Sequence, residues 1–227
     1  MSKTTRCKPA FLRAFMMITA WIVMGTCTAQ TATIQAGTTF SHLDYILRHQ
    51  REFDMYPDMY AGYAVVAGIS YWEKRYFNLS SNLGMLRKGG RDKVIMTDQF
   101  GNPTGEVRNE KATLDYLTLN TLAEFQYPVG ESFAPFLAAG PRIDYLVSHS
   151  AHFDGLEELD ELKRVAGGLV LGGGIKYRAG GFLTGLRTEY YLELSRIAEW
   201  HIEQTGFMGE VKSRTFTLCV VFGYTMR

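Results

Sequence analysis

Seven charged residues in the second half of the chain have the side chains needed for ion pairing or proton transfer. They are Glu124, Arg142, Asp144, Lys176, Arg187, Glu189 and Glu193. Each falls on the polar parity of a segment in which apolar and polar residues alternate. We expect antiparallel strands to bring them together inside a barrel as a salt-bridge plug, because charges excluded from lipid must pair. A proton or ion path, or a gate, is the functional alternative for the same residues.

The stretch SHSAHFD has residue types that could bind a metal ion or hydrolyse an ester. His149, His152 and Asp154 have a spacing compatible with metal ligation. The acid-rich stretch that follows favours a solvated surface loop instead. Ser148 or Ser150 beside His149 has the residue types of the Ser-His-acid group in outer-membrane lipid A hydrolases. Adjacent residues of an extended segment point to opposite faces, however, so neither serine can be the bond partner of His149 there. We therefore predict neither a metal site nor a catalytic site.

Two further stretches have the composition of ligand-binding loops without the required context. Gly172, Gly173 and Gly174 lie inside an alternating segment and no helix follows, so the setting of a phosphate-binding loop is missing. We expect these glycines to relieve crowding or to bend a strand. Residues 97–106 are rich in side-chain oxygens but lack calcium-loop spacing, which favours a hairpin extending the two flanking strands. No bound cofactor is predicted.

The elements that would position these residues show alternation with a period of two. In the last segment, Phe216, Leu218, Val220, Phe222 and Tyr224 form one apolar face. The same pattern through the chain predicts eight strands, at residues 34–41, 60–72, 75–87, 114–127, 133–147, 167–178, 182–196 and 213–225. Most of them exceed the roughly 9 to 11 residues that a strand needs to cross a bilayer.

The connections between these strands alternate in length. Turns of two to five residues alternate with longer connections at residues 42–59, 88–113, 148–166 and 197–212. This is the pattern of an all-β, eight-stranded, antiparallel up-and-down transmembrane β-barrel with long outward loops and short periplasmic turns. The sheet must close because hydrocarbon offers no partner for an open edge. An eight-stranded, porin-like barrel has an interior just wide enough to be filled by side chains, so the strand count alone does not imply an aqueous pore.

Pro141 lies within the fifth predicted strand and has no amide to donate. We expect a bulge or another local irregularity there. A bulge would reverse the inward or outward orientation of Arg142 and Asp144.

The N-terminal residues have the pattern of a secretory signal peptide. A basic stretch through Arg13 precedes an apolar run of about 12 residues and then small residues. We predict a signal peptide at residues 1–29 and a barrel domain at residues 30–227. Residues 1–29 hold four of the 24 basic residues and no acid, leaving 20 basic against 23 acidic residues in the predicted domain. This balance excludes a nucleic-acid partner.

Several segments carry a resemblance to a known family. The stretches YFNLSSNLGMLRKGG, LDYLTLNTLAEFQYPVGESFAPFLAAGPRIDYLV, LVLGGGIKYRAGGFLTGLRTEYYLEL and SRTFTLCVVFGYT resemble the PorT-like outer-membrane β-barrel proteins of the Bacteroidetes. The resemblance implies an outer-membrane location and an eight-stranded barrel whose function is mostly unassigned. One member of that family is implicated in protein secretion and gliding machinery. The chain departs from proteobacterial barrels in lacking a terminal aromatic residue.

The strand pattern, together with the absence of a catalytic signature, indicates a non-enzymatic integral outer-membrane protein. We expect a structural or interaction module of the cell envelope. An accessory subunit of a secretion or envelope-assembly complex and a lipid-modifying barrel enzyme are the alternatives. The expected partners are outer-membrane lipid and lipopolysaccharide, the barrel-assembly machinery during insertion, and envelope or secretion-complex proteins.

Overall fold

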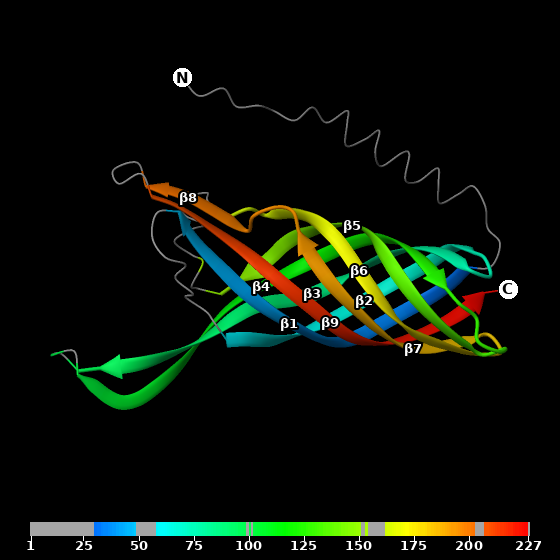
Figure 1. Ribbon diagram of the computed structural model, residues 1–227, viewed down its shortest axis with the longest axis horizontal. Coiled ribbons are helices and arrows are strands. Elements are labelled where there is room, and N and C mark those ends of the chain that lie inside the picture. The colour runs from blue at the N-terminus through cyan, green and yellow to red at the C-terminus, as the bar shows by residue number, and fades with distance from the viewer. Residues whose placement is uncertain are drawn as a thin grey trace, which may run out of the picture.

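The computed structural model describes residues 30–48, 58–98, 100, 102–150, 153, 162–202 and 207–226. The predicted signal peptide lies outside these residues. The described chain forms nine strands (Figure 1): β1 Gln30–Arg48, β2 Asp58–Glu73, β3 Phe77–Thr97, β4 Pro103–Gln126, β5 Phe133–His149, β6 Val165–Ala179, β7 Phe182–Glu193, β8 Ala198–Ile202 and β9 Phe207–Met226. Among the described residues, no helix is long and apolar enough to cross a membrane.

The sheet closes on itself. Strands β1 to β7 pair in sequence order and antiparallel, and β9 pairs along its whole length with β1. Strand β7 pairs with residues 215–224 of β9, and β8 pairs with residues 207–211 of β9. Because β1 occupies the other edge of β9, β7 and β8 together form one interrupted strand. The predicted eight-stranded antiparallel barrel is therefore confirmed.

The strands extend further than the sequence pattern indicates. The predicted long connection at residues 88–113 consists mostly of the outer parts of β3 and β4, so the expected hairpin is present, with β3 ending at Thr97 and β4 beginning at Pro103. The predicted connection at residues 197–212 contains β8 and the start of β9. Figure 1 shows the β3–β4 hairpin projecting from one end of the barrel, whereas the short turns gather at the other end, beside the C-terminus.

The irregularity expected at Pro141 is a gap in the ladder and not a bulge. Strand β5 keeps one register with β4 on both sides of the gap, with Asn120 opposite Arg142 and Ala123 opposite Ala139. The inward orientation of Arg142 and Asp144 is therefore unchanged, and both are buried. The bulge in this ladder lies further out, between Asp115 and Tyr116.

The apolar residues of each alternating strand point outward and form the outer wall of the barrel. Large exposed side chains between the strand ends form an apolar belt, which includes Ile34, Val65, Ile69, Leu83, Leu119, Leu137, Ile143, Leu171, Ile175, Leu186, Leu218 and Phe222. Aromatic rings border the belt near the short turns, at Trp72, Tyr76, Phe125, Tyr127, Phe133, Tyr177, Phe182 and Tyr224. A second border contains Tyr63, Tyr145, Tyr190 and Phe216. Such rings favour the two interfaces between lipid and water, so the belt marks the membrane-spanning part.

The interior has two regions of different polarity. Within the belt, the inward side chains are mostly polar or charged. Toward the long loops, many inward side chains of the same strands are apolar and buried; they include Leu43, Leu86, Leu114, Leu146 and Val211. Phe153, Leu162 and Ile197 belong to this outer apolar core. Among the described residues, an apolar layer therefore lies between the polar interior and the long-loop end of the barrel.

An arginine in the apolar belt should be costly. Leu186 lies midway between Phe182 and Tyr190 on β7 and is 57% exposed. We expect Leu186→Arg to lower the free energy of unfolding by about 2–4 kcal/mol, measured by urea unfolding in liposomes. Val107 is also 57% exposed but lies on the projecting hairpin. Val107→Arg should change stability by less than about 0.5 kcal/mol, and equal losses for the two variants would contradict the assigned belt.

Candidate functional site

All seven charged residues singled out from the sequence lie inside the barrel, in two clusters. The first, the turn-end cluster, contains Glu124 of β4, Lys176 of β6, and Arg187 and Glu189 of β7. Lys176 Nζ is ion-paired with Glu124, and Arg187 Nη1 lies 3.4 Å from Glu124 Oε1. Arg187 Nε donates to Glu189 Oε1 at 2.7 Å. Two cations and two carboxylates thus neutralise one another.

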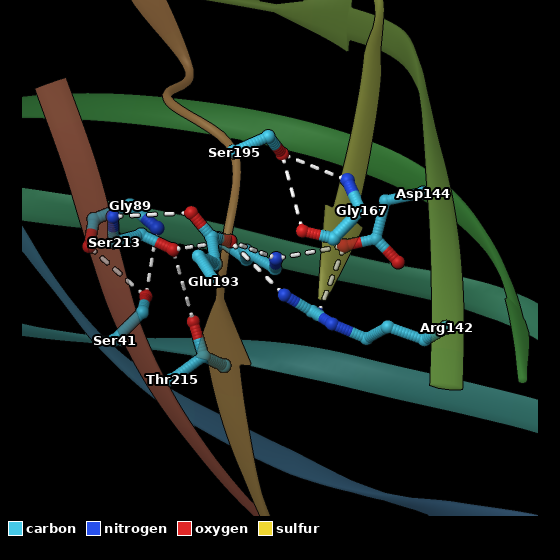
Figure 2. A network of polar contacts seen from close by, with 10 residues as sticks. Ser41, Gly89, Arg142, Asp144, Gly167, Glu193, Ser195, Ser213 and Thr215 are labelled. Atoms are coloured by element: carbon cyan, nitrogen blue, oxygen red, sulfur yellow. Dashed lines mark hydrogen bonds and ion pairs between the residues drawn. The ribbon is translucent and has the colours of Figure 1, made fainter. Parts of the chain in front are cut away.

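The second, the outer-end cluster, contains Arg142 and Asp144 of β5, Glu193 of β7, and Lys88 of β3. Lys88 Nζ lies 2.9 Å from Asp144 Oδ2 and 2.6 Å from Glu193 Oε1. Arg142 contacts the same two carboxylates, at 2.9 and 3.3 Å. Figure 2 shows Glu193 between Arg142 and Ser213, whose hydroxyl donates to Glu193 Oε1 at 2.8 Å.

Lys88 is the residue that the sequence analysis missed. Its side chain is completely buried, although residue 88 stood at the start of a predicted outward loop. The seven predicted residues comprise three cations and four carboxylates, and Lys88 supplies the fourth cation. The charge imbalance and the parity of β3, which places Asn82 and Lys88 on the same face, were the two signals that could have identified it.

Aromatic side chains pack against the charged groups, and one of them contacts both clusters. Tyr191 Oη donates to Glu189 Oε2 at 2.8 Å, while the guanidinium carbon of Arg142 lies 4.6 Å from the centre of the Tyr191 ring. Lys88 Nζ lies 4.8 Å from the centre of the Tyr116 ring. Rings at these distances stabilise desolvated cations. Tyr191 therefore joins the clusters through its hydroxyl on one side and its ring face on the other.

Glycines on the inner face of β6 provide space for the charged side chains. A Cβ at Gly168 would lie 2.3 Å from the carbonyl oxygen of Leu192 and 3.1 Å from Arg142 Nε. A Cβ at Gly172 would lie 2.8 Å from the carbonyl oxygen of Thr188 and 3.0 Å from Glu189 Cγ. Gly168 and Gly172 thus leave room both for the backbone of β7 and for the charged side chains of the interior.

The clusters hold their charges in ion pairs, but several buried polar atoms remain unsatisfied within the described residues. They include Arg142 Nε, Asp144 Oδ1, Tyr116 Oη, Arg187 Nη2 and Thr217 Oγ1. Buried water is the usual partner of such groups. A cavity of about 10 Å³ beside the turn-end cluster has room for about one water molecule. The geometry thus suits a neutral, hydrated plug.

Of the other sequence candidates, the described residues make contacts with nearby backbone groups. His149 Nδ1 lies 3.1 Å from the carbonyl oxygen of Ser150, and the Ser150 hydroxyl accepts from the amide of Thr113 at 3.0 Å. His152 and Asp154 lie outside the described residues, so the metal-ligand triplet as such is not described. In the β3–β4 turn, Asp98 Oδ1 accepts from the amides of Phe100 and Asn102, which fixes the turn.

Comparisons with known proteins agree with this architecture. A family model described as outer membrane protein beta-barrel domain matches residues 29–199. The crystal structure of the outer membrane protein OprG from Pseudomonas aeruginosa is similar, with a TM-score of 0.52 and 12% sequence identity over 87% of this chain and 96% of that one. Neisserial surface protein A gives a TM-score of 0.47 and 12% identity over 87% and 99%. No curated protein matches the chain. At such identity, the likeness to OprG concerns the fold alone.

Removal of the Lys88 cation should be strongly destabilising. Lys88→Met leaves two buried carboxylates sharing the single cation Arg142, and we expect a loss of about 3–5 kcal/mol in the free energy of unfolding. Urea unfolding in liposomes, followed by gel mobility, measures this loss.

A control variant and a double variant show whether the loss is caused by the missing charge. Lys93→Met on the same strand, where the side chain is 65% exposed, should cost less than about 0.5 kcal/mol. Adding Glu193→Gln to Lys88→Met should recover part of the loss, because it removes the surplus negative charge. Unfolding of Lys88→Met at the wild-type urea concentration would show that the outer-end cluster does not stabilise the barrel.

Proposed function

The chain belongs to the outer membrane protein β-barrel domain family, and we propose that it is a non-enzymatic structural or interaction module of the cell envelope. The observation that carries this proposal is the closed, neutral interior. Both charge clusters are ion-paired, and the outer apolar core lies between them and the outside. Within the part of the chain that the structure describes, such an interior offers neither a continuous aqueous path nor an unpaired catalytic base.

Several finer features of this proposal follow from the sequence. We propose that residues 1–29 direct export and are then removed, and that the chain is a PorT-like barrel of the Bacteroidetes. Its apolar belt and aromatic borders suit contact with outer-membrane lipid and lipopolysaccharide. Insertion of a closed barrel would depend on the barrel-assembly machinery.

A second candidate is an accessory subunit of a secretion or envelope-assembly complex. The β3–β4 hairpin favours it, because the hairpin extends beyond the aromatic border and carries exposed apolar side chains. Ile95, Phe100 and Val107 are 59, 79 and 57% exposed. Large exposed apolar side chains beyond the membrane are typical of contact surfaces for other proteins.

The two candidates are separated by the state of the protein in native membranes. The experiment is extraction in mild detergent, size-exclusion chromatography and mass spectrometry of any companions. We expect one species near the mass of the barrel, as for a standalone module. A large, reproducible complex would favour the accessory subunit instead. A change in the mass of lipid A after gene deletion would contradict both and support a lipid-modifying enzyme.

The closed interior predicts that the barrel does not conduct ions. Reconstituted into a planar bilayer, the wild-type protein should give no unitary current, because the outer apolar core excludes water and ions. An open porin at the same protein concentration is the positive control. Reproducible single-channel steps from the wild-type barrel would overturn the proposal of a closed module.

A further inference from the structure

We propose that the periplasmic mouth of the barrel binds a short zwitterionic peptide, one that presents both a carboxylate and an amine. A pocket of about 480 Å³ opens at this end. Its walls are the turns at residues 74–76 and 127–132, and its floor contains Glu73, Gln126 and Arg178. Small-ligand sites in proteins commonly have volumes of about 300–1,000 Å³.

The floor of this pocket is rigidly built and has one free hydrogen-bond acceptor. Gln126 is 3% exposed, and its Nε2 donates to the carbonyl oxygens of Lys74 and Arg75 at 3.0 and 3.4 Å. These bonds fix the amide group against the β2–β3 turn. Gln126 Oε1 is buried and has no partner among the described residues. An N–H group of a ligand would satisfy this oxygen.

The charged residues of the floor neutralise each other, and Arg178 Nε, like Gln126 Oε1, is buried without a partner among the described residues. Arg178 Nη2 is ion-paired with Glu73, which also accepts a hydrogen bond from Thr31 at 3.0 Å. The pair comes from opposite parts of the sheet, β6 and β2, and crosses the mouth of the lumen. The floor is therefore polar but carries no net charge.

The walls carry unpaired charges of opposite sign. The β2–β3 turn presents Lys74 and Arg75, and the β4–β5 turn presents Glu131; all three are exposed. None has an ion-pair partner within the described part of the chain, although Arg75 stacks on the Tyr76 ring at 5.3 Å. A simple anion would satisfy Lys74 but not Glu131, and a neutral sugar would satisfy neither. A ligand with both a carboxylate and an ammonium group matches both walls.

Two periplasmic sources share this chemistry: free short peptides, and the peptide stems of the cell wall, whose first residue is acylated but whose diamino acid supplies the ammonium group. Binding at this mouth requires only the fold and the periplasmic orientation of the short turns. Its failure would leave the proposed structural role untouched, and a conducting or enzymatic barrel would leave the pocket untouched.

The test uses the purified full-length barrel in detergent and isothermal titration calorimetry with trialanine, which has both charged ends. N-acetyl-trialanine lacks the amine and trialanine amide lacks the carboxylate. We expect saturable binding of trialanine and at least about tenfold weaker binding of each blocked peptide. Absence of saturable trialanine binding would overturn the proposal.

Variants assign the two ends of the peptide to the two walls. Lys74→Gln with Arg75→Gln should weaken trialanine binding about tenfold and abolish the preference over trialanine amide. Glu131→Gln should abolish the preference over N-acetyl-trialanine. The matched control, Lys93→Gln with Arg108→Gln, changes two cations that are 65 and 69% exposed on the distant hairpin and should bind as wild type. Equal binding by all variants would also overturn the proposal.

A second measurement identifies the source of the peptide. The barrel is incubated with isolated sacculi, before and after amidase removal of the peptide stems, and the bound fraction is measured. Retention on intact sacculi, but not on amidase-treated sacculi, would assign the site to cell-wall stems. Trialanine binding without retention on sacculi would assign it to free peptides.

Discussion

The architecture depends on one constraint, which is that a backbone amide in hydrocarbon has no partner except another strand. The pairing of β1 with β9 meets this constraint by removing both sheet edges. Closure around eight strands then fixes a narrow interior, and the inward parity of every strand must fill it. The apolar belt and the polar interior are two consequences of the same closed ladder, since successive side chains point to opposite faces.

Charge neutrality in this interior connects strands that do not pair directly. Lys88 of β3 contacts carboxylates from β5 and β7, and Lys176 of β6 reaches Glu124 of β4. A buried cation without a partner would be strongly destabilising, so each cluster is balanced. Inward glycines of β6 make this possible, because a larger residue at Gly168 would meet the Arg142 guanidinium. The two charge clusters thus link strands that do not pair directly and also fill the interior.

Sequence periodicity predicted the strand order and seven of the eight charged residues of the two clusters, because parity is a local property of an extended chain. It failed at the outer strand ends for a physical reason visible in β4. From Ala112 to Tyr116 the inward residues are apolar, and from Leu117 onward the outward residues are apolar. The alternation of the strand continues unchanged, but the surroundings of its outer face change from water near Ala112 to lipid beyond Leu117. The hydrophobic pattern therefore reverses without a break in the strand. Parity could have placed Lys88 on the inner face of β3, but its contacts with Asp144 and Glu193 and the periplasmic pocket join strands distant in sequence, so no local pattern could reveal them.

The pairing of the first and last strands also governs how the barrel can form. Residue 30 lies opposite residue 226, and the ladder between β1 and β9 continues to residues 48 and 208. Nearly the whole chain must therefore be present before the first strand finds its final neighbour. Contacts of such sequence separation make folding slow and leave unpaired edges exposed in the meantime. Strands β1 and β9 thus close the barrel by pairing with each other. A chain truncated within β9 would remain an open, aggregation-prone sheet.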